Sequence, residues 1–87
     1  MTGFLGMDVE AIRALSNQLH QASDQITATA NQINSALSNA QWTGNDANSF
    51  RSDWQSHMSN LNNIANALST ASQQAAQNAQ QQEQASS

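Results

Sequence analysis

Apolar residues recur at seven-residue spacing along two long segments of this 87-residue chain, with polar residues between them. This period is typical of amphipathic helices that bury one face. In the first segment the apolar columns contain Ile12, Leu15, Leu19, Ile26, Ile33 and Leu37. In the second segment they contain Ala47, Phe50, Trp54, Met58, Leu61, Ile64 and Leu68. We expect these side chains to pack within a helical hairpin or against a partner molecule.

The pattern divides the chain, a single domain by its size, into five parts. These are a flexible leader over residues 1–7, a helix over about 8–41, a turn over 42–45, a helix over about 46–80 and a disordered tail over about 81–87. The Asp8 carboxylate can accept a backbone N–H of the first turn, which predicts that it caps the first helix. For the second helix the sequence leaves two N-caps open, Thr43 and Asn45.

The turn contains Trp42, Thr43 and Gly44, close to the midpoint of a chain that has no proline. A reversal between two long helices favours glycine, which tolerates backbone angles that other residues avoid, so Gly44 has a structural explanation. The same reading makes Trp42 an apolar cap over the end of the helices. The predicted fold class is all-α, an antiparallel helix-turn-helix hairpin.

The apolar content is low for a self-sufficient core. Alanine supplies 15 of the apolar residues, and only 14 larger apolar side chains remain once the leader is set aside. Their full burial would contribute roughly 20–40 kcal/mol, whereas ordering the chain costs about 1.5 kcal/mol per residue. We therefore expect the hairpin to dimerise into a four-helix bundle.

Charge and composition argue against several classes of partner. The chain has 2 Lys and Arg against 6 Asp and Glu, a net charge of −4, so no basic patch can neutralise a nucleic-acid backbone. The same shortage removes the cationic face that holds an amphipathic helix on anionic lipid, and the longest apolar runs are pairs of residues. We expect neither nucleic-acid binding nor stable membrane insertion.

Few residues are candidates for chemistry. His57 lies in an apolar column and His20 at the edge of the polar face, each without a second ligand at metal-binding spacing. Asp46 and Asp53 lie seven residues apart with no nucleophile nearby, and we interpret them as helix-dipole and solubility residues. The sequence predicts no enzyme, with no catalytic residue, cofactor or metal.

The turn is followed by a small residue and then by aromatic residues, in the order Ala47, Phe50 and Trp54. Together with the Trp-x-Gly turn near the middle, the chain length and the lack of cysteine, this series resembles the WXG (ESAT-like) family of Gram-positive bacteria. The leader also lacks the charge and apolar stretch of a signal peptide. The resemblance implies a virulence-associated or effector subunit without catalysis. Such a subunit is made in the cytoplasm, exported as a folded dimer by a type VII (ESX-like) system, and found secreted or at the cell surface.

The family's C-terminal secretion signal, Tyr-x-x-x-Asp/Glu, is degenerate here. Glu83 supplies the acid, but Ala79 occupies the place of the tyrosine. The resemblance therefore implies contact with the secretion ATPase either directly or through a partner that carries the signal, which slightly favours a heterodimer with another WXG-type protein. A homodimer follows closely, because the flanking columns contain glutamine rather than charges that would select a different chain. The alternative function is an intracellular helical adaptor, or the companion of a larger toxin with a similar hairpin.

Overall fold

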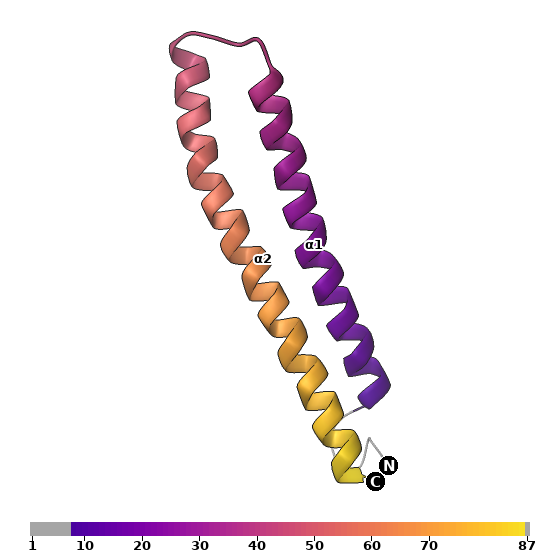
Figure 1. Ribbon diagram of the computed structural model, residues 1–87. Coiled ribbons are helices and arrows are strands. Elements are labelled where there is room, and N and C mark those ends of the chain that lie inside the picture. Colours follow the sequence, from indigo (N-terminus) through magenta and orange to yellow (C-terminus); the bar gives the residue numbers. More distant parts are fainter. Residues whose placement is uncertain (1–7, 87) are drawn as a thin grey trace.

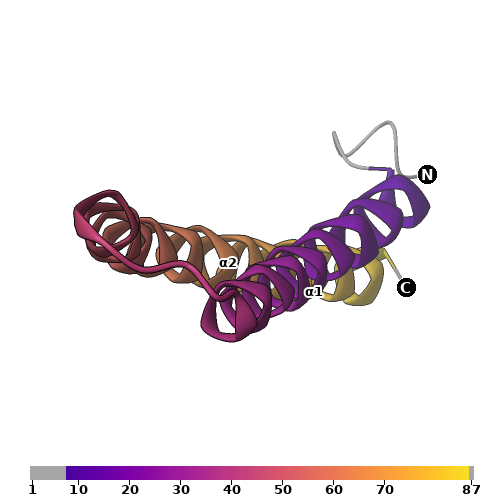
Figure 2. The ribbon, with the colours of Figure 1, turned by 90° about the horizontal axis from the view of Figure 1, so that it is seen from above.

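The computed structural model describes residues 8–86 as two antiparallel helices joined at one end (Figure 1). Helix α1 spans Val9–Asn39 and helix α2 spans Asn45–Ser86. They form a narrow rod with principal extents of 64 × 17 × 15 Å, and the view from above shows that the two helices are not parallel (Figure 2). The predicted all-helical hairpin is confirmed, whereas the predicted leader over residues 1–7 lies outside the described residues. Within the described part, neither helix is long and apolar enough to cross a membrane.

Helix α1 begins where the sequence predicted. Asp8 has an extended backbone, and its Oδ1 accepts a hydrogen bond from the Ala11 backbone N–H at 3.2 Å. Glu10 adds a negative charge in the first turn, where the positive end of the helix dipole favours it. The helix ends at Asn39 because Ala40 leaves the helical conformation, although its N–H still donates to the Ala36 carbonyl at 3.0 Å.

The corner between the helices depends on Gly44. This residue has a φ of 110°, a conformation that residues with a side chain rarely adopt. Its carbonyl accepts the Asn48 N–H at 3.0 Å, which is the first hydrogen bond of α2. Gly44 therefore occupies the N-cap position itself, between the two candidates, Thr43 and Asn45, that the sequence suggested.

Helix α2 extends beyond the end predicted at about residue 80 and continues to Ser86. Residues over 81–86 are helical, in contrast to the disordered tail that the sequence suggested. Two contacts with α1 explain the difference. Ala79 is completely buried, and Glu83 pairs with Arg13 of α1 at 2.8 Å. Side-chain packing thus adds to the helix propensity of the Gln- and Ala-rich sequence.

The helices meet along a line of mostly small residues, which we call the seam. Its members are Val9, Ser16, Ser23 and Ala30 of α1, and Ala47, Trp54, Ala65, Ser72 and Ala79 of α2, all of them buried. On α1 these residues recur every seven positions, one column around the helix from the predicted Ile12 column. Apart from Val9 and Trp54, the side chains of the seam are those of alanine and serine, which let the two backbones approach closely.

Three serine hydroxyls cross the seam. Ser16 Oγ donates to the Ser72 carbonyl and Ser72 Oγ donates to the Ser16 carbonyl, both at 2.8 Å, which makes a reciprocal pair. About two helical turns further along α1, Ser23 Oγ donates to the Ala65 carbonyl at 2.7 Å. Among the described residues, no buried side-chain nitrogen or oxygen lacks a hydrogen-bond partner. The three serine hydroxyls in the seam are therefore all hydrogen-bonded, which removes the usual penalty for burying hydroxyl groups.

Candidate interaction surface

The seam uses few of the large apolar side chains, and most of them remain accessible. Of the residues predicted to pack, Ala47 and Trp54 are buried, and seven are half-buried: Ile12, Leu19, Ile26, Leu37, Met58, Leu61 and Leu68. Four are exposed by between 42% and 48%: Leu15, Ile33, Phe50 and Ile64. Exposure of this order on so many large apolar residues is unusual for a protein that functions as a monomer.

These accessible residues gather on one side of the hairpin. On α1 the columns of Ile12 and Leu15 follow one another around the helix on one flank of the seam, and Arg13 lies on the other flank. Arg13 pairs with Glu83 of α2, so the Glu83 flank of α2 belongs to the same side as Arg13. The opposite flank of α2 contains the column of Phe50 and Ile64. We call the resulting surface the apolar face; it consists of Ile12, Leu15, Leu19, Ile26 and Ile33 of α1 with Phe50, Leu61, Ile64 and Leu68 of α2.

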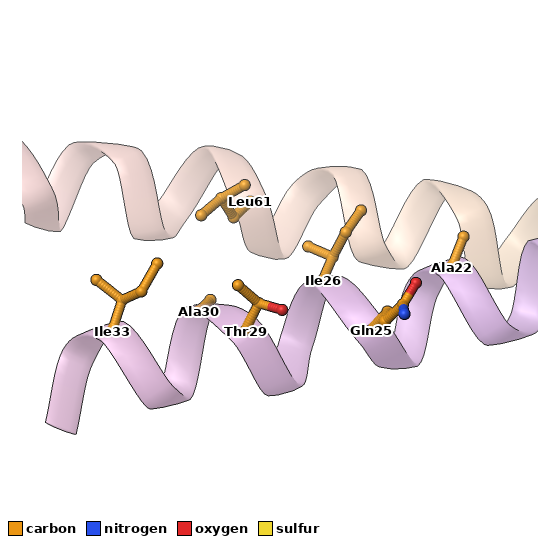
Figure 3. A pocket seen from close by; sticks show the side chains of 7 residues that line it. All are labelled: Ala22, Gln25, Ile26, Thr29, Ala30, Ile33 and Leu61. Carbon is orange, nitrogen blue, oxygen red and sulfur yellow. The ribbon is translucent and has the colours of Figure 1, made fainter. Parts of the chain in front are cut away.

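An open groove of about 330 Å³ lies in the middle of the apolar face. Figure 3 shows its lining, a stretch of α1 with Leu61 of α2 opposite. The lining residues are Ala22, Gln25, Ile26, Thr29, Ala30, Ile33 and Leu61. Aliphatic side chains dominate this lining and no charged group is among them, so the groove suits an apolar side chain better than a polar ligand.

The opposite side of the hairpin is polar and contains ion pairs. Arg13 contacts Glu10 at 3.3 Å and Glu83 at 2.8 Å, and His20 contacts Asp24 at 3.3 Å. The hydrogen bond from the Arg13 guanidinium, together with its positive charge, lowers the pKa of Glu83 below its ordinary value. The same pair raises the pKa of Arg13. The side chains of these groups are between 41% and 85% exposed, so the pairs contribute little to the stability of the whole hairpin, although Arg13–Glu83 holds the end of α2 locally.

At the corner Trp42 remains 39% exposed, so the predicted cap covers the helix ends only in part. Its ring contacts Phe50 with centroids 5.4 Å apart and a tilt of 53°, and Arg51 Nη1 donates to its carbonyl at 2.9 Å. Trp54 is buried, and its Nε1 donates to Asn34 Oδ1 at 3.3 Å. Trp42 and Phe50 therefore extend the apolar face to the corner, while Trp54 holds the helices together behind it.

The two residues that the resemblance assigns to a degenerate secretion signal are part of the folded hairpin. Ala79 has no exposed surface, and Glu83 is engaged with Arg13. A tyrosine in place of Ala79 would have no room unless α2 moved away from α1. The sequence pattern did not indicate the Arg13–Glu83 pair, because the period of each helix does not show the register between the two helices.

The apolar pattern did not indicate Ser16, Ser23 or Ser72, although the spacing of small residues contained a sign of the seam. Ser16 and Ser23 continue the seven-residue spacing that begins at Val9, and a search for small residues at that period would have found the seam. Among residues 8–86, no group of three His, Cys, Asp or Glu side chains could hold a metal ion. His57 lies exposed in the Phe50 column of α2, and His20 is engaged with Asp24.

Comparison with known proteins finds no matching family model, no matching curated protein and no matching solved structure. The resemblance to WXG proteins therefore depends on the sequence features described above, and these comparisons do not test it. Residues 8–86 therefore form a hairpin with an accessible apolar face, a groove at the centre of that face and a solvated side behind it.

Proposed function

We propose that this chain is a protein-interaction subunit that packs its apolar face against a second helical hairpin to form a four-helix bundle. The observation that carries this proposal is that the seam and the apolar face consist of different residues. Small residues join the two helices of one chain, while Leu15, Ile33, Phe50 and Ile64 stay exposed on one side. Burying such side chains is the main driving force for association in water.

The proposed context is export by a type VII (ESX-like) secretion system in a Gram-positive bacterium. Its basis is the Trp42-Thr43-Gly44 corner followed by Ala47 and Phe50, a series that resembles WXG proteins. In this reading the chain is made in the cytoplasm and exported as a folded dimer, as a substrate, a co-secretion partner or both. Trp42 and its Phe50 contact are accessible at the corner, where a second protein can reach them.

One observation favours the alternative, an intracellular adaptor or the companion of a larger toxin. Ala79 and Glu83, which hold the place of the family's export signal, are engaged with α1. A chain whose own signal is engaged in this way either travels with a partner that carries the signal or stays inside the cell. The two readings share the apolar face and differ only in where the complex ends up.

An export assay distinguishes the secreted subunit from the intracellular adaptor. The chain is expressed in a Gram-positive host with an active type VII system and in the same host without the secretion ATPase, and culture medium and cells are probed for it. A cytoplasmic enzyme measured in both fractions controls for lysis. ATPase-dependent appearance in the medium supports the export role. Retention in the cells of both strains, with a known substrate still exported, would leave only the intracellular adaptor.

A further inference from the structure

We infer that residues 4–7 of this chain fold back over the apolar face at the open end of the hairpin, opposite the corner, where Phe4 and Leu5 cover Leu15. The inference rests on the proposed function in one respect only, because that function makes this face a binding surface, part of which the chain then covers itself. Residues 4–7 belong to the leader, which lies outside the described residues. Their placement follows from the shape of the face, the reach of the leader and its chemistry.

The apolar face is incomplete at the open end of the hairpin. In the middle and at the corner both helices contribute large side chains, such as Ile33 of α1 and Phe50 of α2. Toward the open end, the columns of Phe50 and Leu61 continue on α2 only as Ala71 and Ala75, which are half-buried. A space for a large apolar group therefore remains beside the large side chains of α1.

Leu15 lies level with this space. Ser16 bonds to Ser72 across the seam, which sets the register of the antiparallel helices at this end. On α2, Ala71 and Ala75 flank Ser72. On α1, Leu15 directly precedes Ser16, so the two alanines lie on either side of Leu15 along the rod. Leu15 is 43% exposed, and no large apolar side chain of α2 is level with it.

The leader is long enough to reach this space and too short to reach the groove. An extended chain spans at most about 3.5 Å per residue, so the Cα atom of Phe4 lies within about 14 Å of that of Asp8. At a rise of about 1.5 Å per residue, Leu15 lies about 10 Å along α1 from Asp8, whereas Ala22, where the groove begins, lies about 21 Å along it. Phe4 can therefore reach Leu15 after a reversal at Gly6, because glycine tolerates the backbone angles that a turn requires.

The start of α1 directs the leader toward the apolar face. Asp8 is the N-cap, since its Oδ1 accepts the Ala11 N–H at 3.2 Å, so Met7 directly precedes the cap and Ile12 is the fourth helical residue. Apolar residues at these two positions commonly pack against each other and fix the angle at which the chain enters the helix. Ile12 is half-buried and belongs to the apolar face. Met7 packed on Ile12 therefore brings the preceding residues onto the same face.

The leader has the chemistry of this face and not of the opposite side. Residues 1–7 contain four large apolar side chains and no charged one. The opposite side at this end of the hairpin contains the ion pair of Arg13 and Glu83. Burying Phe4 and Leu5 in the space on the apolar face removes apolar surface from water, whereas the charged side offers no such gain.

Disulfide formation within one chain tests this placement, because the natural chain has no cysteine. The full-length chain with Leu5→Cys and Ala75→Cys is oxidised at low chain concentration. Its matched control, with Leu5→Cys and Ala76→Cys, moves the second thiol by one residue, to the flank that contains Arg13 and Glu83. We expect the first pair to close at least about 10-fold faster, because the fold-back gives its thiols the higher effective concentration. Equal rates, or a disulfide that joins two chains instead of closing within one, would overturn the inference.

The accessibility of a thiol at position 15 gives an independent readout. Full-length Leu15→Cys is labelled with N-ethylmaleimide, with the natural leader and with Phe4→Ser and Leu5→Ser together, at a dilution where sedimentation shows monomers. The polar leader should raise the labelling rate about 3-fold or more, as expected when a segment covers the thiol in most molecules. Ile33→Cys lies beyond the reach of the leader and should be labelled at the same rate with either one. Circular dichroism checks that the helices persist in every variant.

The outcomes separate this inference from the proposed function. Equal labelling of Leu15→Cys with both leaders would overturn the inference, whatever the export assay shows. A polar leader that raises the labelling of Ile33→Cys as much as that of Leu15→Cys would also overturn it, because the effect would then extend over the whole hairpin. Export and hairpin binding are measured on the natural chain, so their failure would overturn the proposed function and leave the leader contact in place.

Discussion

The reciprocal serine pair offers a direct test of how the helices are held together. In Ser16→Ala the hydroxyl that donates to the Ser72 carbonyl is lost, while that carbonyl still accepts its own helical hydrogen bond. The lost bond is worth about 1 kcal/mol of unfolding free energy. Alanine has the better helix propensity and returns up to about 0.5 kcal/mol. The net change is therefore small unless propensity is controlled.

Ser38→Ala provides that control, because the Ser38 hydroxyl bonds only within α1, to the Asn34 carbonyl at 3.0 Å. Relative to this control, Ser16→Ala should destabilise the protein by about 1 kcal/mol, and Ser16→Ala with Ser72→Ala by somewhat less than about 2 kcal/mol. The deficit arises because the two hydroxyls are 3.2 Å apart and influence one another, so their effects are not additive.

Urea unfolding followed by circular dichroism gives these differences as shifts of the midpoint at constant slope. All variants are compared at one chain concentration, because association adds to the apparent stability. If the double variant is as stable as Ser38→Ala, the seam hydroxyls do not hold the helices, and close apolar approach alone would account for the hairpin.

Four further predictions concern the corner and the end of α2. Gly44→Ala should cost about 1–3 kcal/mol through its positive φ alone, since an added Cβ meets nothing within 4 Å, and urea unfolding measures it. Trp42→Ala should cost well under the about 3–5 kcal/mol of a buried aromatic, because the ring is partly exposed; loss of export with intact helices would make Trp42 a recognition residue. Ala79→Tyr should raise amide exchange at the end of α2 by displacing it from α1, and unchanged exchange would show that the seam tolerates a large side chain there. Because the pKa of Glu83 is lowered, its pairing with Arg13 is complete at pH values above the ordinary carboxyl range and is lost as the pH falls below that range. The end of α2 should therefore fray in acid. Glu83→Gln should fray the same end at neutral pH.

The sequence was sufficient for the local features of the fold. Asp8 at the start of α1, the reversal at Gly44 and two long helices all follow from capping chemistry and a seven-residue period. It was insufficient for the packing, because a hydrophobic pattern identifies the largest apolar side chains and assigns them to the nearest interface. In this hairpin Ser16 and Ser72 occupy that interface, and large side chains such as Leu15 lie outside it.

The end of α2 shows a second limit of sequence analysis. Composition alone suggested that the chain frays after about residue 80, since large apolar residues stop at Leu68. The helix continues because Ala79 fits the seam and Glu83 meets Arg13, two contacts that exist only once the helices have a register. The sequence pattern identified the large apolar residues of the candidate surface. It did not show that these residues lie outside the seam, because that depends on how the two helices pack.

The hairpin topology also determines how the protein responds to force. The described ends of α1 and α2 lie together at the end of the rod opposite the corner (Figure 1). A motor that pulls on the α2 end while α1 is held would load the cross-helix contacts one after another, like a zipper. The Arg13–Glu83 pair would open first, then the Ser16–Ser72 pair, then the Ser23 bond to Ala65. Because no two of these contacts share the load, the hairpin resists such pulling far less than it resists one helix sliding along the other.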